Sequence, residues 1–363
     1  MLKESTYNYA IDFWKLFFAL MVVAYHKAIT DKFGGIFQGG YIAVDFFFMV
    51  SGYFMVHTFM RRQNSDEKIC VGIKTVEFIR RKFISIYPYI ILSAFGSFII
   101  SCRGVSTGSL ISNVKRLIME ILLLNMTGFS EGVMYVNWYI SGLLLTLIIL
   151  VPLLYYLKKD YICMLSPLLS ILIYGWISQN IGYVRGSESE FFGVLRLGVW
   201  RGIAGVAAGS FCWYLADKLS EIRLNKLGKM IISIGIGISI IIIVSNAIFY
   251  PCSQQDFISI MCIAFLCIAI FSKQSLFYNL YNYKISACLR EWSTSIFFMA
   301  GLGSSIACYM VVNLKIDSAV HKSLLWYLGS ISAAGFGMLF VKMLKYINKK
   351  VNWKEIFIMK DRI

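Results

Sequence analysis

Two residues near the start of the chain, Lys15 and His26, have side chains suited to chemistry within a long apolar segment. The segment reads IDFWKLFFALMVVAYHKAI, and the two residues stand 11 positions apart. In an α-helix that spacing is about three turns plus roughly 20°, so both side chains share one face, about 16 Å apart along the axis. An ionisable residue inside an apolar segment is costly and is therefore a functional candidate. The alternative is that Lys15 extends its amino group to water and His26 caps the helix.

Asp45 is the acidic residue that could act with His26. It lies in the stretch GGYIAVDFFFMVSGY, at the start of the second apolar segment and at about the depth of His26. A carboxylate beside an imidazole fixes its tautomer and stabilises its charged form, as general-base catalysis requires. We therefore expect His26 and Asp45 to be catalytic, with Asp45 orienting His26. The alternative is that Asp45 is an ordinary first-turn acid of its helix.

A basic cluster in the segment FIRRKFISIYPYI could bind phosphate groups. Arg80 and Arg81 lead this cluster, and the planar guanidinium group suits phosphate oxygens. The alternative is that the cluster only anchors the chain on anionic lipid. Pro88 follows shortly after and is expected to kink or break the helix early in the third apolar segment.

The composition indicates that these residues are positioned by helices that cross a membrane. Hydrophobic residues make up 58% of the 363 residues and charged residues 15%, whereas soluble domains carry about 25% charged residues. A crossing helix needs about 20 mostly apolar residues, and the long runs here lack the alternation typical of a barrel. The sequence therefore predicts an all-α polytopic membrane protein with about ten spans, at roughly 10–29, 42–60, 83–101, 138–157, 161–179, 199–216, 230–248, 257–272, 292–312 and 323–342.

The distribution of Lys and Arg predicts the orientation of these spans. With the N-terminus in the cytoplasm, 24 basic residues fall on the inner side and nine on the outer side, as the positive-inside rule requires. Both termini are then cytoplasmic. The net charge of +16 is explained by these loops, so we expect no nucleic-acid partner. Segment 105–125 is amphipathic and is expected to lie at the surface.

The same survey predicts one membrane domain over residues 1–363. Its core covers about 8–345 and a short cytoplasmic tail covers 346–363, because no linker or internal repeat divides the chain. The nine cysteines are scattered and form neither a CxxC pair nor a His/Cys cluster. We therefore expect no metal site.

These motifs together resemble the acyltransferase-3 family of integral membrane acyltransferases. The resemblance covers the whole chain and is specific mainly in the first 90 residues. The first span matches the family's L-D-G-L-R, ten residues and His at Asp12, Lys15 and His26, with Lys15 in place of the usual Arg. Later blocks match at Gly39, Gly40, Asp45, Phe47, Phe48, Ser51, Gly52, Tyr53, Arg80, Arg81, Pro88, Trp138, Tyr139, Pro152, Arg201, Gly205 and Gly209. The late S-x-S-x-Y-L-x-H element is reduced to Ser293-Thr294-Ser295, and Ala300 replaces its His.

The resemblance implies an O-acetyltransferase of the plasma membrane. Such an enzyme takes an acyl group, usually acetyl, from acetyl-coenzyme A at the cytoplasmic side and passes it to a hydroxyl of a carbohydrate or cell-envelope glycan. On this basis Lys15, Arg80 and Arg81 are candidate residues for binding coenzyme A. Trp138 and Arg201 are candidate substrate-binding residues.

A second function class is a transporter or flippase for a lipid-linked sugar. Transporters often consist of repeated halves with paired broken helices, and the sequence shows no such pairing. The candidate chemistry also falls in the first three spans. The sequence therefore favours the acyltransferase.

Overall fold

The structure, a computed structural model, is almost entirely helical. It describes residues 8–30, 33–62, 70–103, 106–129, 137–186, 189–276, 278 and 283–350; residues 351–363 of the predicted tail lie outside this set. The first half contains α1 (Ala10–Ile29), the 3₁₀ turn η1 (Gly40–Ile42), α2 (Ala43–Arg62), α3 (Val71–Phe83), α4 (Tyr87–Ser101), α5 (Thr107–Ile121), α6 (Trp138–Leu157), the π-helical turn η2 (Tyr161–Leu165) and α7 (Ser166–Asn180). The second half contains the two-residue strands β1 (Phe191–Phe192) and β2 (Leu195–Arg196), then α8 (Leu197–Glu221), α9 (Lys226–Phe249), α10 (Gln255–Ser272), α11 (Tyr283–Asn313) and α12 (Ala319–Lys350).

Every predicted span coincides with a helix, but fewer helices than expected are apolar enough to cross a membrane. Within the described residues seven helices meet that requirement, or eight if the bent pair α3–α4 forms one span. Helices α1 and α8 do not meet it. Helix α1 carries Asp12, Lys15 and Lys27, and α8 carries Arg201 and four glycines. The chain is thus a multi-pass membrane protein, and the count of ten stays a prediction.

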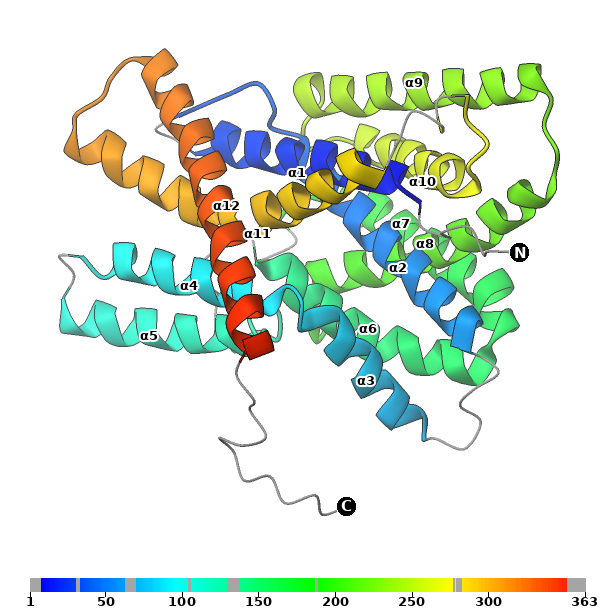
Figure 1. Cartoon of the computed structure of the whole chain (residues 1–363), viewed down its shortest axis with the longest axis horizontal. Coiled ribbons are helices and arrows are strands. Elements are labelled where there is room, and N and C mark those ends of the chain that lie inside the picture. Colours follow the sequence, from blue (N-terminus) through cyan, green and yellow to red (C-terminus); the bar gives the residue numbers. More distant parts are fainter. Residues whose placement is uncertain are drawn as a thin grey trace.

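The two less apolar helices each pack against several other helices. Helix α8 packs against α2, α6, α7 and α10, while α11 packs against α1, α4 and α12 (Figure 1). By contrast, only 22% of the most apolar stretch of α9 is buried. Lipid demands an apolar surface only where it touches the helix, so an enclosed helix can carry polar groups that neighbouring helices satisfy.

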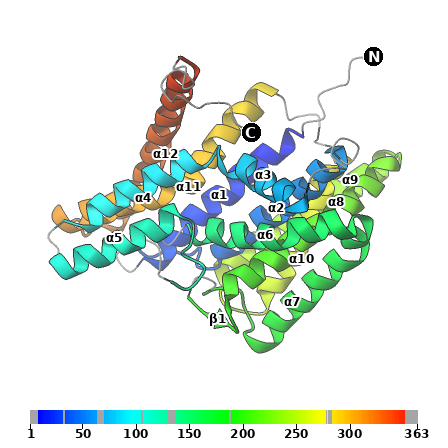
Figure 2. The ribbon, with the colours of Figure 1, turned by 90° about the horizontal axis from the view of Figure 1, so that it is seen from below.

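The predicted break at Pro88 is confirmed. Helix α3 ends at Phe83 and α4 starts at Tyr87, with a bend of 59° between them and Pro88 in the first turn of α4. A proline at that position lacks only an N–H that a first turn leaves unpaired, so the new helix can start there. The amphipathic segment forms the 15-residue helix α5, which lies beside α4 at one edge of the molecule in both views (Figure 1, Figure 2); its place at the membrane surface stays a prediction.

Segments predicted to share a side of the membrane meet in the structure. The Gly39 amide donates to the Ala247 carbonyl at 2.8 Å, joining two segments predicted to be outer. The Asn8 side chain donates to the Ile270 carbonyl at 2.6 Å, joining two predicted to be inner. Which of these sides faces the cytoplasm stays a prediction from the basic residues.

Glycines allow α2 and α8 to cross in backbone contact. A Cβ on Gly52 would overlap the carbonyl oxygen of Val206, and one on Gly209 would overlap that of Met49. Small residues at a crossing let helix backbones approach closely in a membrane. This crossing sets the distance between Asp45 on α2 and Arg201 on α8.

We predict that Gly52→Ala and Gly209→Ala each lower the thermal unfolding midpoint and the folded yield. The added methyl group must displace a backbone carbonyl, and overpacking of this kind costs about 1–3 kcal/mol or more. Gly175→Ala on α7 is the matched control, since a Cβ there meets no atom within 4 Å. A melting experiment on the purified protein in which all three variants unfold alike would contradict the close crossing.

Candidate functional site

Two cavities line up along α1 and contain most of the residues that the sequence singled out. The first, here called the Lys15 pocket, also contains Lys82, Ser51, Tyr139 and residues of α11. The second, the His26 pocket, also contains Trp138 and Arg201. Lys15 and His26 thus lie on one face of α1, as the spacing predicted, but they open into different cavities.

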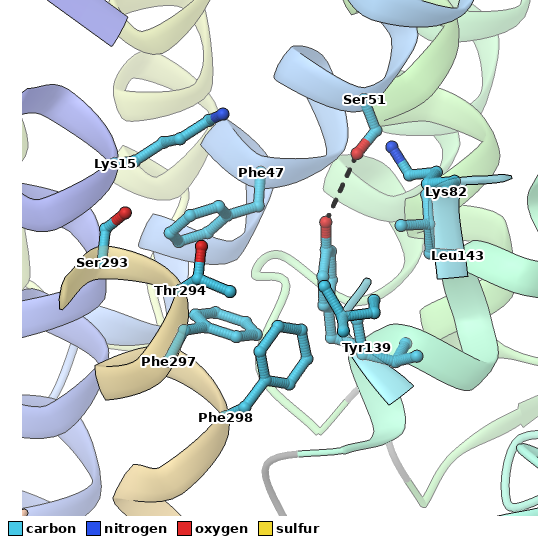
Figure 3. A pocket seen from close by; sticks show the side chains of 12 residues that line it. Lys15, Phe47, Ser51, Lys82, Tyr139, Leu143, Ser293, Thr294, Phe297 and Phe298 are labelled. Atoms are coloured by element: carbon cyan, nitrogen blue, oxygen red, sulfur yellow. Dashed lines mark hydrogen bonds between the residues drawn. The ribbon is translucent and has the colours of Figure 1, made fainter. Parts of the chain in front are cut away.

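The Lys15 pocket has a cationic end and an aromatic end. Its volume is about 180 Å³. In Figure 3 the amino groups of Lys15 and Lys82 lie toward one side, and the rings of Phe297 and Phe298 lie toward the other. The hydroxyls of Ser51 and Tyr139 are 3.5 Å apart. Such a cavity suits an anionic ligand that carries a neutral arm.

The cationic residue that α3 contributes is Lys82, while Arg80 and Arg81 are exposed. Thr75 and Phe83 form the buried face of this helix, and Lys82 follows Thr75 by seven residues, or about two turns. Arg81 pairs instead with Glu77 on the solvent side. The assignment of Arg80 and Arg81 to donor binding stays a prediction, and Lys82 is a pocket residue that it did not include.

Asp12 fixes the end of α1 beside the Lys15 pocket. Its buried carboxylate accepts a hydrogen bond from the Ser286 hydroxyl and two from Arg290, each at 3.2 Å. These partners belong to α11, so the first turn of α1 is tied to α11. Lys15 itself lies over the Phe54 ring, 5.3 Å from its centroid.

The His26 pocket is smaller, about 70 Å³, and it is lined by rings and guanidinium groups. Tyr25, Tyr41 and Trp138 contribute rings, while Arg185 and Arg201 contribute cations. His26 lines this cavity, and among the described residues no side chain hydrogen-bonds its imidazole. A neutral imidazole in this position can accept a proton from a bound hydroxyl.

Asp45 contacts Arg201 and Tyr174 rather than His26. Arg201 Nη2 donates to Asp45 Oδ2 at 2.5 Å, its Nε lies 3.2 Å from both carboxylate oxygens, and the Tyr174 hydroxyl donates to Oδ1 at 2.7 Å. Both side chains of the ion pair are at most 1% exposed. Asp45 therefore neutralises Arg201 beside the His26 pocket, which corrects the expected contact with His26; a catalytic role for Asp45 stays a prediction.

Tyr41 and Val184 connect this ion pair to a second buried acid. Their carbonyl oxygens accept from Arg201 at 2.8 and 3.0 Å. The Tyr41 hydroxyl and the Val184 amide donate to Asp256 Oδ2 at 2.8 and 3.1 Å. The loop between α7 and β1 and the turn before α2 are thereby held beside the His26 pocket.

Arg185 brings a cation to the same pocket from the loop after α7. Its Nη1 donates to Cys252 Sγ at 3.6 Å. That hydrogen bond, together with one to Tyr25, raises the pKa of Arg185 above its ordinary value despite partial burial. Sequence reasoning missed this residue, because a lone arginine in a loop has no distinguishing spacing.

The structure thus groups the predicted residues in two sets. His26, Trp138 and Arg201 share one pocket, and Asp45 stands behind Arg201. Lys15 shares the other with Ser293 and Thr294 of the reduced late element. Within the described residues no group of three or more His, Cys, Asp and Glu side chains is placed to hold a metal ion.

The comparisons with known proteins identify the family. A sequence model of the acyltransferase-3 family, described as an acyltransferase domain, matches residues 8–332. The chain therefore belongs to this family and is a membrane acyltransferase. No curated protein and no solved structure matches it.

We predict that Asp45→Asn and Arg201→Gln each destabilise the protein by about 3–5 kcal/mol, because each leaves a buried charge without its partner. The double variant should lose less than the sum of the two, since it leaves neither charge alone. Thermal unfolding of the four proteins measures this coupling. Additive losses of stability in the double variant would contradict the ion pair. If Asp45→Asn instead abolished acyl transfer at parental stability, Asp45 would have a catalytic role.

Proposed function

We propose that this membrane acyltransferase moves an acyl group, in the simplest case acetyl, from coenzyme A at the cytoplasmic side to a hydroxyl of a carbohydrate, such as a cell-envelope glycan at the plasma membrane. The observation that carries the proposal is the arrangement along α1. One helix face presents Lys15 to one pocket and His26 to the next. A donor approaching from one side and an acceptor from the other can therefore use the same protein core.

The Lys15 pocket has the chemistry to hold the donor. Coenzyme A carries phosphates at one end and a thioester at the end of a long neutral arm. Lys15 and Lys82 supply the positive charge, and exposed Arg80 and Arg81 are proposed to attract the phosphates from the cytoplasm. Lys carries a compact point charge, whereas Arg presents a planar group with several donors. Two lysines together can therefore bind the anionic end that one arginine would otherwise bind.

The His26 pocket has the chemistry to hold the acceptor. An indole ring such as that of Trp138 offers an apolar face to a sugar ring, while Arg185 and Arg201 add donors around it. Most of the donors of Arg201 are bound by Asp45, Tyr41 and Val184. Arg201, held in place and neutralised by Asp45, is therefore proposed to shape the wall of the pocket rather than to attract a charge.

His26 is proposed to act as the general base. Its imidazole takes the proton from the acceptor hydroxyl as the oxygen attacks the acyl carbonyl carbon. The carbon–sulfur bond breaks, and the proton passes to the departing thiolate, which regenerates the neutral imidazole. A covalent acyl-histidine relay, in which His26 is the nucleophile, is the alternative route for the same residues.

We predict that Lys15→Gln and Lys82→Gln each raise the KM for acetyl-coenzyme A several-fold while kcat changes less, because charge on a distant phosphate adds mostly uniform binding. The Arg80→Gln, Arg81→Gln double variant should act in the same direction. Lys74→Gln is the matched control on α3, since Lys74 lies over the Tyr155 ring and outside the Lys15 pocket. An unchanged donor KM in every lysine and arginine variant would contradict a donor site here.

We predict that His26→Ala and His26→Gln reduce transfer by about 10²–10⁴-fold, the usual contribution of a general base. Labelled acetyl-coenzyme A offered to inside-out membrane vesicles measures this loss, and the exposed His321→Gln is the control. Transfer within about tenfold of the parent in correctly inserted variants would exclude His26 from either route. Labelled acetyl trapped on the parent protein without acceptor would favour the relay.

A further inference from the structure

The ion pair between Asp12 and Arg290 lies one helical turn from the Lys15 pocket on both helices that carry it. On α1, Asp12 precedes Lys15 by three residues, which places the two side chains on the same face. On α11, Arg290 precedes the pocket residues Ser293 and Thr294 by three and four residues. The pair therefore joins α1 to α11 just beyond the pocket, at the ends of these helices that the positive-inside rule predicts to be cytoplasmic.

The charges around this pair act on one another. Asp12 and Arg290 are both close enough to Lys15 to interact electrostatically with its amino group. Lys15 interacts in the same way with Lys82, which lines the same pocket. Three of these four side chains are basic and one is acidic, so the cluster keeps an excess of positive charge beside the pocket.

The ion pair presents its positive end to the surface. The side chain of Asp12 is 0% exposed, whereas that of Arg290 is 43% exposed. Asp12 Oδ2 accepts hydrogen bonds from Nε and Nη2 of Arg290, both at 3.2 Å, and from the Ser286 hydroxyl. The buried carboxylate therefore holds the guanidinium group in one place. A group that is already fixed binds an anion with less loss of side-chain freedom.

We infer that Arg290 binds a phosphate group of the donor, and that Asp12 is the residue that positions Arg290. This inference rests on the proposed transfer from coenzyme A, whose phosphates lie at the far end of the neutral arm from the thioester. Lys15 and Lys82 form the cationic end of the pocket (Figure 3), and Arg290 adds a third cation on the predicted cytoplasmic side. A guanidinium group suits this role because its planar set of donors matches phosphate oxygens.

The neighbouring pair of Glu291 and Lys342 provides a matched control. Lys342 Nζ of α12 lies 2.6 Å from Glu291 Oε2 of α11, and both side chains are at least 50% exposed. Glu291 follows Arg290 directly, so its side chain projects about 100° further around α11 and meets α12 instead of α1. Replacing this pair removes one acid and one base from the same end of α11 and changes no residue that lines the Lys15 pocket.

The test compares acetyl-coenzyme A with S-acetylpantetheine, which keeps the thioester and the neutral arm but carries no phosphate. Inside-out vesicles from cells that express the full chain supply the native acceptor. The variants are Arg290→Gln, Arg290→Lys and the double variant Asp12→Asn, Arg290→Gln. The double variant is needed because Arg290→Gln alone leaves a buried carboxylate without its cation, which lowers stability. The control is the double variant Glu291→Gln, Lys342→Gln.

We expect the KM for acetyl-coenzyme A to rise about tenfold or more in both variants that carry Arg290→Gln, because a hydrogen bond between two charged groups is lost. The kcat should change less, since phosphate binding is mostly uniform binding. The preference for acetyl-coenzyme A over S-acetylpantetheine should fall by a similar factor. Arg290→Lys should show a smaller effect, because it keeps the charge and loses the planar geometry. The control should keep the parental KM and the parental preference.

An unchanged KM for acetyl-coenzyme A in both variants that carry Arg290→Gln would overturn phosphate binding by Arg290 and leave the proposed function standing. Equal losses with the two donors, or a fall in kcat at constant KM, would overturn it as well, because either result assigns Arg290 a structural role. A parent that transfers acetyl from neither donor would overturn the proposed function together with the inference.

Discussion

The Asp45–Arg201 ion pair joins the two helices around which the site is built. Two charges removed from water need each other and further hydrogen bonds to be tolerated, and here Tyr174, Tyr41 and Val184 provide them. The pair can form only because glycines let α2 and α8 cross in backbone contact. In return, Arg201 holds the segments that carry Tyr41 and Val184, and these segments form part of the wall around His26. The shape of the His26 pocket thus depends on one buried ionic contact.

The polarity of α1 and α8 follows from the same constraint. Both helices carry charges that lipid would not accept, and both pack against several other helices. The helices that lipid surrounds, such as α9, are the more apolar ones. The site residues Lys15, His26 and Arg201 lie on these two helices, while α2 and α6 contribute Asp45 and Trp138 from more typical spans. A hydropathy threshold therefore overlooks two of the helices that carry site residues.

Much of the helical arrangement was predictable from the sequence because it depends on local patterns. Apolar length located the helices, helical periodicity placed Lys15 and His26 on one face, and Pro88 marked the break before α4. The partner of Asp45 was not predictable, because Arg201 follows it by 156 residues and only the α2–α8 crossing brings them together. The role of Lys82 was easier to predict than the partner of Asp45. Thr75 and Phe83 define a buried face of α3, and Arg80 and Arg81 lie away from that face.

The rigidity of α1 decides where movement must occur during transfer. At one end Asp12 is tied to Ser286 and Arg290 of α11, and toward the other the Trp326 indole of α12 donates to the Val23 carbonyl at 3.2 Å. Lys15 and His26 therefore keep a constant separation, whichever pocket is filled. A donor held at the lysines must bring its acyl group forward on its own flexible arm, because the helix cannot carry the group across. The rings of Phe47, Tyr139 and Phe297 pack against one another in the Lys15 pocket, and side-chain rotation is the motion that a packed helical core permits at least cost.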